Sequence, residues 1–194
     1  MKRMSLVVMS CLAISVSGYC AEPQTDVSIA RGASDATVQG VAKVRATIVA
    51  IDPATRTVTL KGASGKVLEL EVPSEARNFD QLAVGDVVKA EYRESLTLSL
   101  VDKKTQASRS ESETAERTSL GEKPGGQVGR EVTVIADVIA VDRHAKVVTL
   151  RGPRETVDLH VEDPERLKHI KKGDQVKAVY TEALAISVEP ESKK

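Results

Sequence analysis

One long phrase of this chain occurs twice with small changes. GDVVKAEYRESLTLSL begins at Gly85, and GDQVKAVYTEALAISV begins at Gly173. Further matches precede both copies: VRATIVAID, from Val44, corresponds to VIADVIAVD, from Val134, and TVTLKG then corresponds to VVTLRG. Such self-similarity predicts an internal duplication, so the chain is expected to fold as two alike units of about 60 residues.

Within each copy, apolar residues recur at every second position, which is the period of a β-strand. The first copy has LELEV from Leu68, and the second has VDLHV from Val157. The same alternation runs through VKAEY from Val88 and through LTLSL from Leu96. One face of each strand is therefore expected to be apolar, and the chain is predicted to be mainly β.

Between the third and fourth strands, the pattern changes to that of a short helix. In DPERLKHIKKG, Asp163 is expected to cap the helix, Pro164 to take its first position and Gly173 to end the segment. Three strands, a short helix and two strands are the order of a five-stranded OB-like barrel. The predicted fold is thus two tandem five-stranded OB-like small barrels, with SH3-like barrels as the alternative, each with a short helix between strands 3 and 4.

Residues 1–20 have the layout of a secretory signal peptide. Lys2 and Arg3 precede an uncharged apolar run that is too short to span a bilayer, and small residues follow it. Cleavage is expected after Cys20, with lipidation of Cys20 as the alternative, since Tyr19 stands where a lipoprotein signal has a small residue. The protein is therefore expected to be periplasmic or secreted, without a transmembrane segment.

The content of apolar residues divides the rest of the chain into two repeats and the segments that flank them. Residues 21–40 and 102–128 are poor in apolar side chains and are predicted to be a flexible N-terminal tail and a flexible linker. They flank the β-barrel repeats, predicted at 41–101 and 129–189, and residues 190–194 form a C-terminal tail. Because a unit of about 60 residues is marginally stable alone, the two repeats are expected to pack on each other.

The charge balance restricts the class of partner. The chain has 28 basic and 28 acidic residues, whereas a nucleic-acid-binding domain has a basic excess. Only Phe79, Tyr92 and Tyr180 supply rings after the leader, too few for a base-stacking surface. No nucleic-acid partner is predicted, and a protein of the cell envelope is the expected class of partner.

Two tyrosine–glutamate pairs are the candidate partner-binding face. Tyr92 with Glu94 and Tyr180 with Glu182 recur as Tyr-x-Glu-x-Leu. The alternative is that each ring closes one end of its barrel while the glutamate faces solvent. No catalytic or cofactor-binding residue is predicted, and no cofactor is expected.

Four aspartates recur at equivalent positions and are predicted to be turn residues. Asp52 and Asp142 each follow a strand, and Asp86 and Asp174 each follow a glycine. Aspartate at the start of a turn accepts hydrogen bonds from backbone N–H groups. This role explains the four residues without a carboxylate pair for catalysis.

Three histidines, His144, His160 and His169, occur only in the second copy. They have no two-ligand spacing on a single element, so no metal site is predicted. A periplasmic metal-handling protein that uses carboxylates and these histidines remains the alternative function.

The patterns VxAVDxxxxxVTLxG and VGDxVxAxY carry a family resemblance. With them the chain resembles exported bacterial proteins of unknown function that are built from small OB-like β-barrel domains. In strand order it is more distantly similar to periplasmic copper-chaperone barrels, which hold copper with His, Met and Trp; here Trp is absent and every Met lies in the leader. The resemblance implies an exported, non-catalytic binding or scaffolding module.

Overall fold

The computed structural model describes residues 24–32, 35–101 and 105–191. The predicted signal peptide, residues 1–20, and the choice between cleavage and lipidation at Cys20 lie outside these ranges. None of the helices within them has the length and hydrophobicity needed to cross a membrane.

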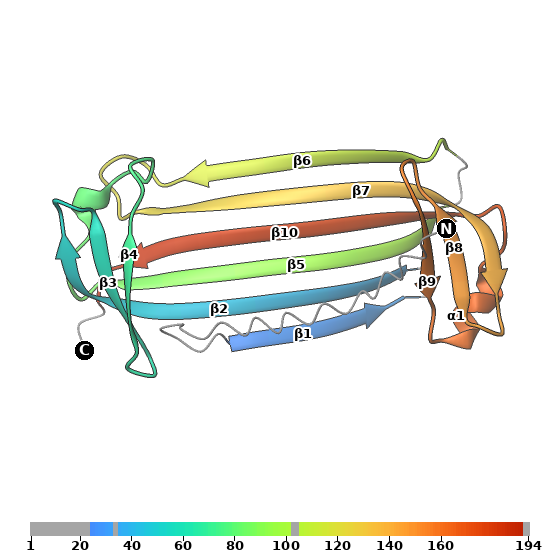
Figure 1. The fold of residues 1–194 in the computed structure, drawn as a ribbon, viewed down its shortest axis with the longest axis horizontal. Coiled ribbons are helices and arrows are strands. Elements are labelled where there is room, and N and C mark those ends of the chain that lie inside the picture. Colours follow the sequence, from blue (N-terminus) through green and yellow to red (C-terminus); the bar gives the residue numbers. More distant parts are fainter. Residues whose placement is uncertain (1–23, 33–34, 102–104, 192–194) are drawn as a thin grey trace.

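Ten antiparallel strands form one sheet in the described part of the chain (Figure 1). Its long strands are β2 (Asp35–Asp52), β5 (Val87–Val101), β7 (Gly125–Asp142) and β10 (Gln175–Glu189). The shorter strands are β1 (Gln24–Arg31), β3 (Thr57–Gly62), β4 (Val67–Glu71), β6 (Ser108–Arg117), β8 (Val147–Arg151) and β9 (Thr156–His160). The order is β4-β3-β2-β5-β10-β7-β8-β9, with β1 paired to β2 and β6 to β7. The prediction of a mainly β protein is confirmed.

A small folded-over module lies at each end of the long strands (Figure 1). The pairing register shifts between Ile48 and Ala50 of β2, and it shifts between Val138 and Ala140 of β7. A β-bulge bends and twists the strand that contains it. The β3–β4 and β8–β9 hairpins therefore turn across the ends of the sheet, and we call them, with the helical turn that follows each, the first and second end modules.

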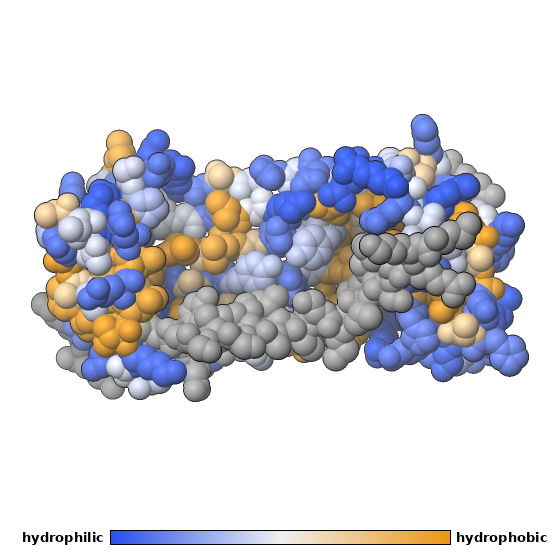
Figure 2. Space-filling view, viewed as in Figure 1, coloured by the Kyte–Doolittle hydropathy of each residue, from blue (hydrophilic) through white to orange (hydrophobic). Residues whose placement is uncertain are grey.

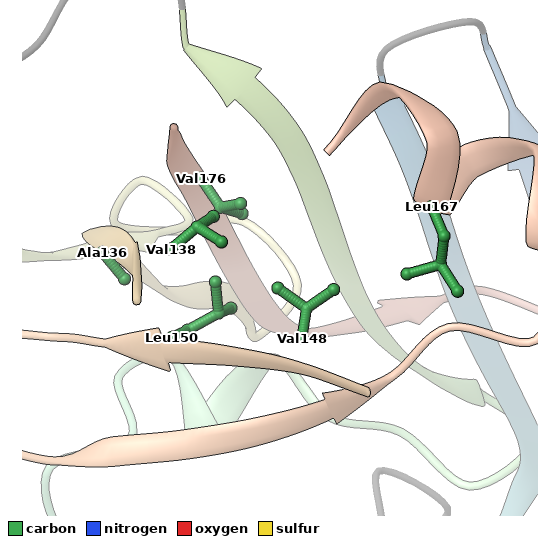
Figure 3. Close-up of a cluster of buried hydrophobic side chains, with 6 residues drawn as sticks. All are labelled: Ala136, Val138, Val148, Leu150, Leu167 and Val176. Carbon is green, nitrogen blue, oxygen red and sulfur yellow. The ribbon is translucent and has the colours of Figure 1, made fainter. Parts of the chain in front are cut away.

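The hydrophobic core is divided between these modules. The first cluster contains Ala46, Ile48, Val58, Leu60 and Phe79. The second cluster contains Ala136, Val138, Val148, Leu150, Leu167 and Val176, which come from β7, β8, α1 and β10 (Figure 3). Leu98 and Leu100 of β5 pack against this second cluster, so it combines side chains from both copies of the repeat.

The predicted helix forms in the second copy as α1 (Pro164–His169). The Asp163 side chain accepts a hydrogen bond from the Glu165 N–H, and Pro164 takes the first turn, as expected. In the first copy, a single 3-10 turn, η1 (Phe79–Gln81), replaces it after Asn78, which has a left-handed backbone. A helical turn thus stands at the predicted place in both copies.

The predicted closed barrels do not form. β4 and β9 end the hydrogen-bonded path of the sheet, so the sheet is open at both end modules. The segments 88–92 and 96–100, expected as separate strands, are parts of the continuous strand β5, and β10 is continuous in the same way. The connecting residues Arg93, Glu94 and Ser95 include no Gly, Pro, Asn or Asp to reverse the chain.

The two segments predicted to be flexible also contain strands. Residues 21–40 include β1 and the start of β2, and residues 102–128 include β6 and the start of β7. Every residue of β1 and β6 is exposed, so burial does not order them. Backbone pairing of β1 with β2 and of β6 with β7 orders these two strands. Composition alone does not reveal such pairing.

The two copies meet edge to edge, mainly through backbone hydrogen bonds, and Leu98 and Leu100 add aliphatic packing at the second end module. β5 and β10 pair over their full lengths, and Glu94 lies directly opposite Glu182 at the middle of the pair. Equivalent residues of the two copies, such as Tyr92 and Tyr180, lie symmetrically about this point. The sheet therefore has an approximate two-fold axis, perpendicular to its plane, between the two glutamates.

Candidate binding face

The long strands place their apolar residues on one side of the sheet. Side chains alternate between the two faces of a strand, and the pairing register fixes which of them are neighbours. The even-numbered residues of β5 and β10 share one face with the even-numbered residues of β2 and β7 that precede the bulges in those two strands. We call this face the apolar face. Both core clusters include residues of this face, for example Ala46 and Ala136, so both end modules stand on it.

Three rows of side chains cross the middle of the apolar face. The central row runs through Val27, Gly40, Glu94, Glu182, Arg130 and Glu113. The row toward the second end module runs through Ile29, Val38, Leu96, Tyr180, Val132 and Glu111. The row toward the first end module runs through Thr25, Ala42, Tyr92, Leu184, Val128 and Ala115.

No second layer covers these rows in the described structure. Val38 is 44% exposed, Val128 is 54% exposed and Leu184 is 38% exposed, whereas Ile48 and Val138 in the end clusters are 1% exposed. Figure 2 shows hydrophobic surface beside each end module and a hydrophilic area between them. The face is thus apolar toward its ends and polar at its centre.

The four residues predicted as a partner-binding face form this polar centre. The Tyr92 hydroxyl donates to Glu94 Oε2 over 3.4 Å, and the Tyr180 hydroxyl donates to Glu182 Oε2 over 3.0 Å. Burial raises the pKa of both tyrosines, and the neighbouring glutamates raise it further. The structure therefore brings the two recurring pairs together from β5 and β10, and neither ring closes a barrel.

On the side of β7 and β6, the face carries a chain of ion pairs. Arg130 Nε lies 2.6 Å from Glu111 Oε1, and Arg109 Nη2 lies 2.9 Å from Glu111 Oε2. These guanidinium groups hold the pKa of Glu111 below its usual range. Arg130 Nη1 also lies 3.7 Å from Glu182 Oε1, which links the ion pairs to the polar centre.

On the side of β2 and β1, the same positions are apolar. Gly40 is the neighbour of Glu94, as Arg130 is the neighbour of Glu182. Val27 and Ile29 of β1 continue the face and are 73% and 54% exposed. The two halves of the face therefore differ in charge, although the backbone is nearly symmetric.

The opposite face of the sheet is polar. Thr37 Oγ1 and Thr97 Oγ1 are 2.9 Å apart, and Ser95 Oγ and Thr181 Oγ1 are 2.7 Å apart. Lysine–glutamate pairs also lie on this face. These hydrogen bonds and ion pairs are typical of a sheet face that is exposed to water. Antiparallel sheets commonly have one such polar face and one apolar face.

A groove of about 480 Å³ lies where the apolar face meets the second end module. Leu98, Leu100 and Ile170 are among the residues that line it. His160 and His169 also line it, whereas His144 lies in the turn between β7 and β8. Among the residues that the structure describes, no group of three His, Cys, Asp or Glu side chains is placed to hold a metal ion.

The recurring aspartates have the predicted turn roles. Asp52 Oδ1 accepts from the Ala54 N–H, and Asp142 Oδ1 accepts from two N–H groups of its turn. Asp86 accepts from the Ala83 N–H, and Asp174 accepts from the N–H three residues earlier. The turn interpretation is confirmed for all four, and none of them lies at the polar centre.

Sequence reasoning missed three components of the face: Gly40, Arg130 and strand β1. The alternation of Val27 and Ile29 with polar residues was a signal for β1. Gly40 and Arg130 had no such signal, because their importance depends on which residues lie opposite them. No protein-family model matches the chain, and neither a curated protein nor a solved structure is significantly similar to it.

Proposed function

We propose that the protein is an exported, non-catalytic binding or scaffolding module of the cell envelope, and that the apolar face receives its partner. The observation that carries the proposal is that no second layer in the described structure covers this face between the end modules, where Val27, Ile29 and Val38 are exposed neighbours on one side of the polar centre and Val128 and Leu184 on the other. Apolar sheet faces are normally covered by a second layer. Contiguous exposed apolar patches are typical of interaction sites.

Export is proposed from the sequence of residues 1–20. Their basic start and short apolar run are what a secretory leader requires. The rest of the chain supplies the binding surface.

Two adjacent residues allow a direct test, because Val38 lies on the apolar face and Gln39 on the polar face, and both are exposed. A photo-crosslinking amino acid is introduced at each position in turn, in the native cell envelope. We expect a discrete adduct from position 38 and none from position 39. Equal labelling from the two positions, or no adduct from position 38, would contradict the proposal.

A further inference from the structure

The approximate two-fold axis allows each charged side chain of the apolar face to be compared with its counterpart. Glu182 has Arg130 beside it, at 3.7 Å. The matching neighbour of Glu94 is Gly40, which has no side chain. Among the described residues, the one hydrogen-bond partner found for the Glu94 carboxylate is the Tyr92 hydroxyl, and no cation is paired with this carboxylate.

The carboxylate of Glu94 extends over Gly40. A Cβ atom added at Gly40 would lie 3.4 Å from both Cγ and Oε1 of Glu94. The space beside this carboxylate is therefore open toward the face and bounded by the backbone of β2. A cationic group entering from above can approach Oε1 without displacing a side chain at position 40.

The surroundings of Glu94 on this half of the face are apolar. Val38 and Ala42 flank Gly40 on β2, and Val27 lies beyond it on β1. The flanking rows are about 7 Å from the central row, since a strand rises about 3.3 Å per residue. A complementary surface therefore carries one cation with apolar groups on both sides of it.

A helix fits these requirements better than an extended chain. A segment that lies across the face, away from its edges, must satisfy its own backbone hydrogen bonds, and a helix does so. Its side chains three or four positions apart are about 5 to 6 Å apart, close to the separation of the rows. Helices commonly form the second layer on a sheet.

A second copy of the chain is a poorer occupant. Face-to-face packing about a two-fold axis at the polar centre would place Glu94 and Glu182 against the same two residues of the other copy. Like charges brought together in this way are destabilising. Arg130 of each copy is already engaged with Glu111 and Glu182.

We propose that the apolar face binds an amphipathic helix of another protein, which places one lysine or arginine side chain over Gly40 and against Glu94. This proposal rests on the proposed function and names the chemistry of the partner. Val38, Leu96 and Ala42 contact the apolar residues of the helix. The ion pairs of Arg130 make the other half of the face less suited to a cation.

The test uses two labelled synthetic helices of about four turns, each with leucine on one face and glutamine on the other. One carries a single lysine at the centre of the leucine face, and the other carries norleucine there. Each is titrated against the purified protein by fluorescence anisotropy. We expect Glu94→Gln to weaken binding of the lysine helix about tenfold and to leave the norleucine helix nearly unchanged, because only the lysine helix loses a charge-assisted hydrogen bond.

Two further variants serve as controls. Glu182→Gln removes the carboxylate that already has Arg130, so its effect on the lysine helix should be clearly smaller than that of Glu94→Gln. Gly40→Arg supplies a cation from within the chain. It should weaken binding of the lysine helix about as much as Glu94→Gln does. The comparison of the two helices on the unaltered protein does not depend on any variant folding.

Each result distinguishes this inference from the proposed function. If Glu94→Gln weakens binding of both helices equally, or weakens binding of neither, the proposed role of Glu94 is wrong. If neither helix binds while position 38 still crosslinks specifically, the partner is not a cationic helix, although the face remains a binding surface. A position-38 adduct of two copies of the chain would show self-association and would also overturn the inference.

Discussion

The hydroxyl groups of Tyr92 and Tyr180 are fixed by the glutamates two positions further along the same strands. Residues two apart in a strand share a face, so the repeated Tyr-x-Glu spacing places each hydroxyl near a carboxylate. Because β5 and β10 are paired, the two local contacts become one polar cluster.

Alkaline pH should destabilise the protein through these tyrosines. Burial, followed by the hydrogen bond to Glu182, raises the pKa of Tyr180 above its ordinary value of 10.0. A group whose folded-state pKa is raised contributes its full stability below the unfolded-state pKa and loses it as pH rises through the folded-state pKa. Tyr180→Phe should therefore cost roughly 1 kcal/mol at neutral pH and reduce the loss of stability above about pH 10.

Urea unfolding across this pH range measures the effect, and ultraviolet absorbance of the phenolate follows the ionisation itself. Tyr92→Phe is the matched variant, since burial also raises the pKa of Tyr92. Ionisation of both tyrosines at the ordinary value would show that the polar cluster does not form.

For individual residues, the sequence predicted the roles that depend on neighbours along the chain. The turn aspartates and the Tyr-x-Glu pairs follow from local spacing and were recognised. Gly40 matters for the face only because Glu94 lies opposite it on β5. Arg130 matters only because Glu182 lies opposite it on β10. That knowledge requires the strand register, which spans most of the chain.

Among the elements, the loop of the β6–β7 hairpin is attached to the first end module by several hydrogen bonds, and one of them is also an ion pair with a buried carboxylate. Lys123, in this loop, places Nζ 2.6 Å from Asp86 Oδ2 and 2.6 Å from the Gln81 carbonyl oxygen. The Asp86 side chain is only 5% exposed. Removal of the lysine would leave a buried carboxylate without its cation.

Lys123→Ala should lower the free energy of unfolding by about 2 kcal/mol, because a buried charge that loses its partner is costly. Lys168→Ala is the control, since its pair with Glu165 is exposed on both sides, and it should change stability by less than about 0.5 kcal/mol. Urea denaturation of the two variants provides the comparison. Similar midpoints for both would mean that the hairpin contact adds little.

Elements were predicted well where apolar alternation or capping defined them. The strands β3, β4 and β9 and the helix α1 have the expected places. β6 was missed because SRSESETAER has no apolar alternation, and its order comes from pairing with β7. The break expected within β5 was wrong because no turn residue stands there.

For the whole molecule, the second cluster, which includes side chains of both copies, predicts that the second half is not stable alone as a monomer. Residues 105–191 would lose Leu98 and Leu100 from their core and would expose the edge of β10 that pairs with β5. We expect this fragment to form a homodimer in which β10 pairs with its own copy about Glu182. Light scattering and a concentration-dependent melting temperature would detect it.

Coexpression with residues 24–101 should replace the homodimer by a one-to-one complex, because that fragment returns Leu98 and Leu100 to the core. A monomer of 105–191 that melts at the temperature of the whole chain would contradict this account. The sequence analysis likewise expects a single repeat to be marginally stable alone.

The joining of both halves in one chain has a consequence for the apolar face. In a symmetric homodimer, any substitution appears on both sides of the axis at once, so the two sides stay identical. Here residue 40 is glycine while residue 130 is arginine, so the two sides differ. Covalent linkage thus permits a directional surface, on which a bound molecule has a single preferred orientation.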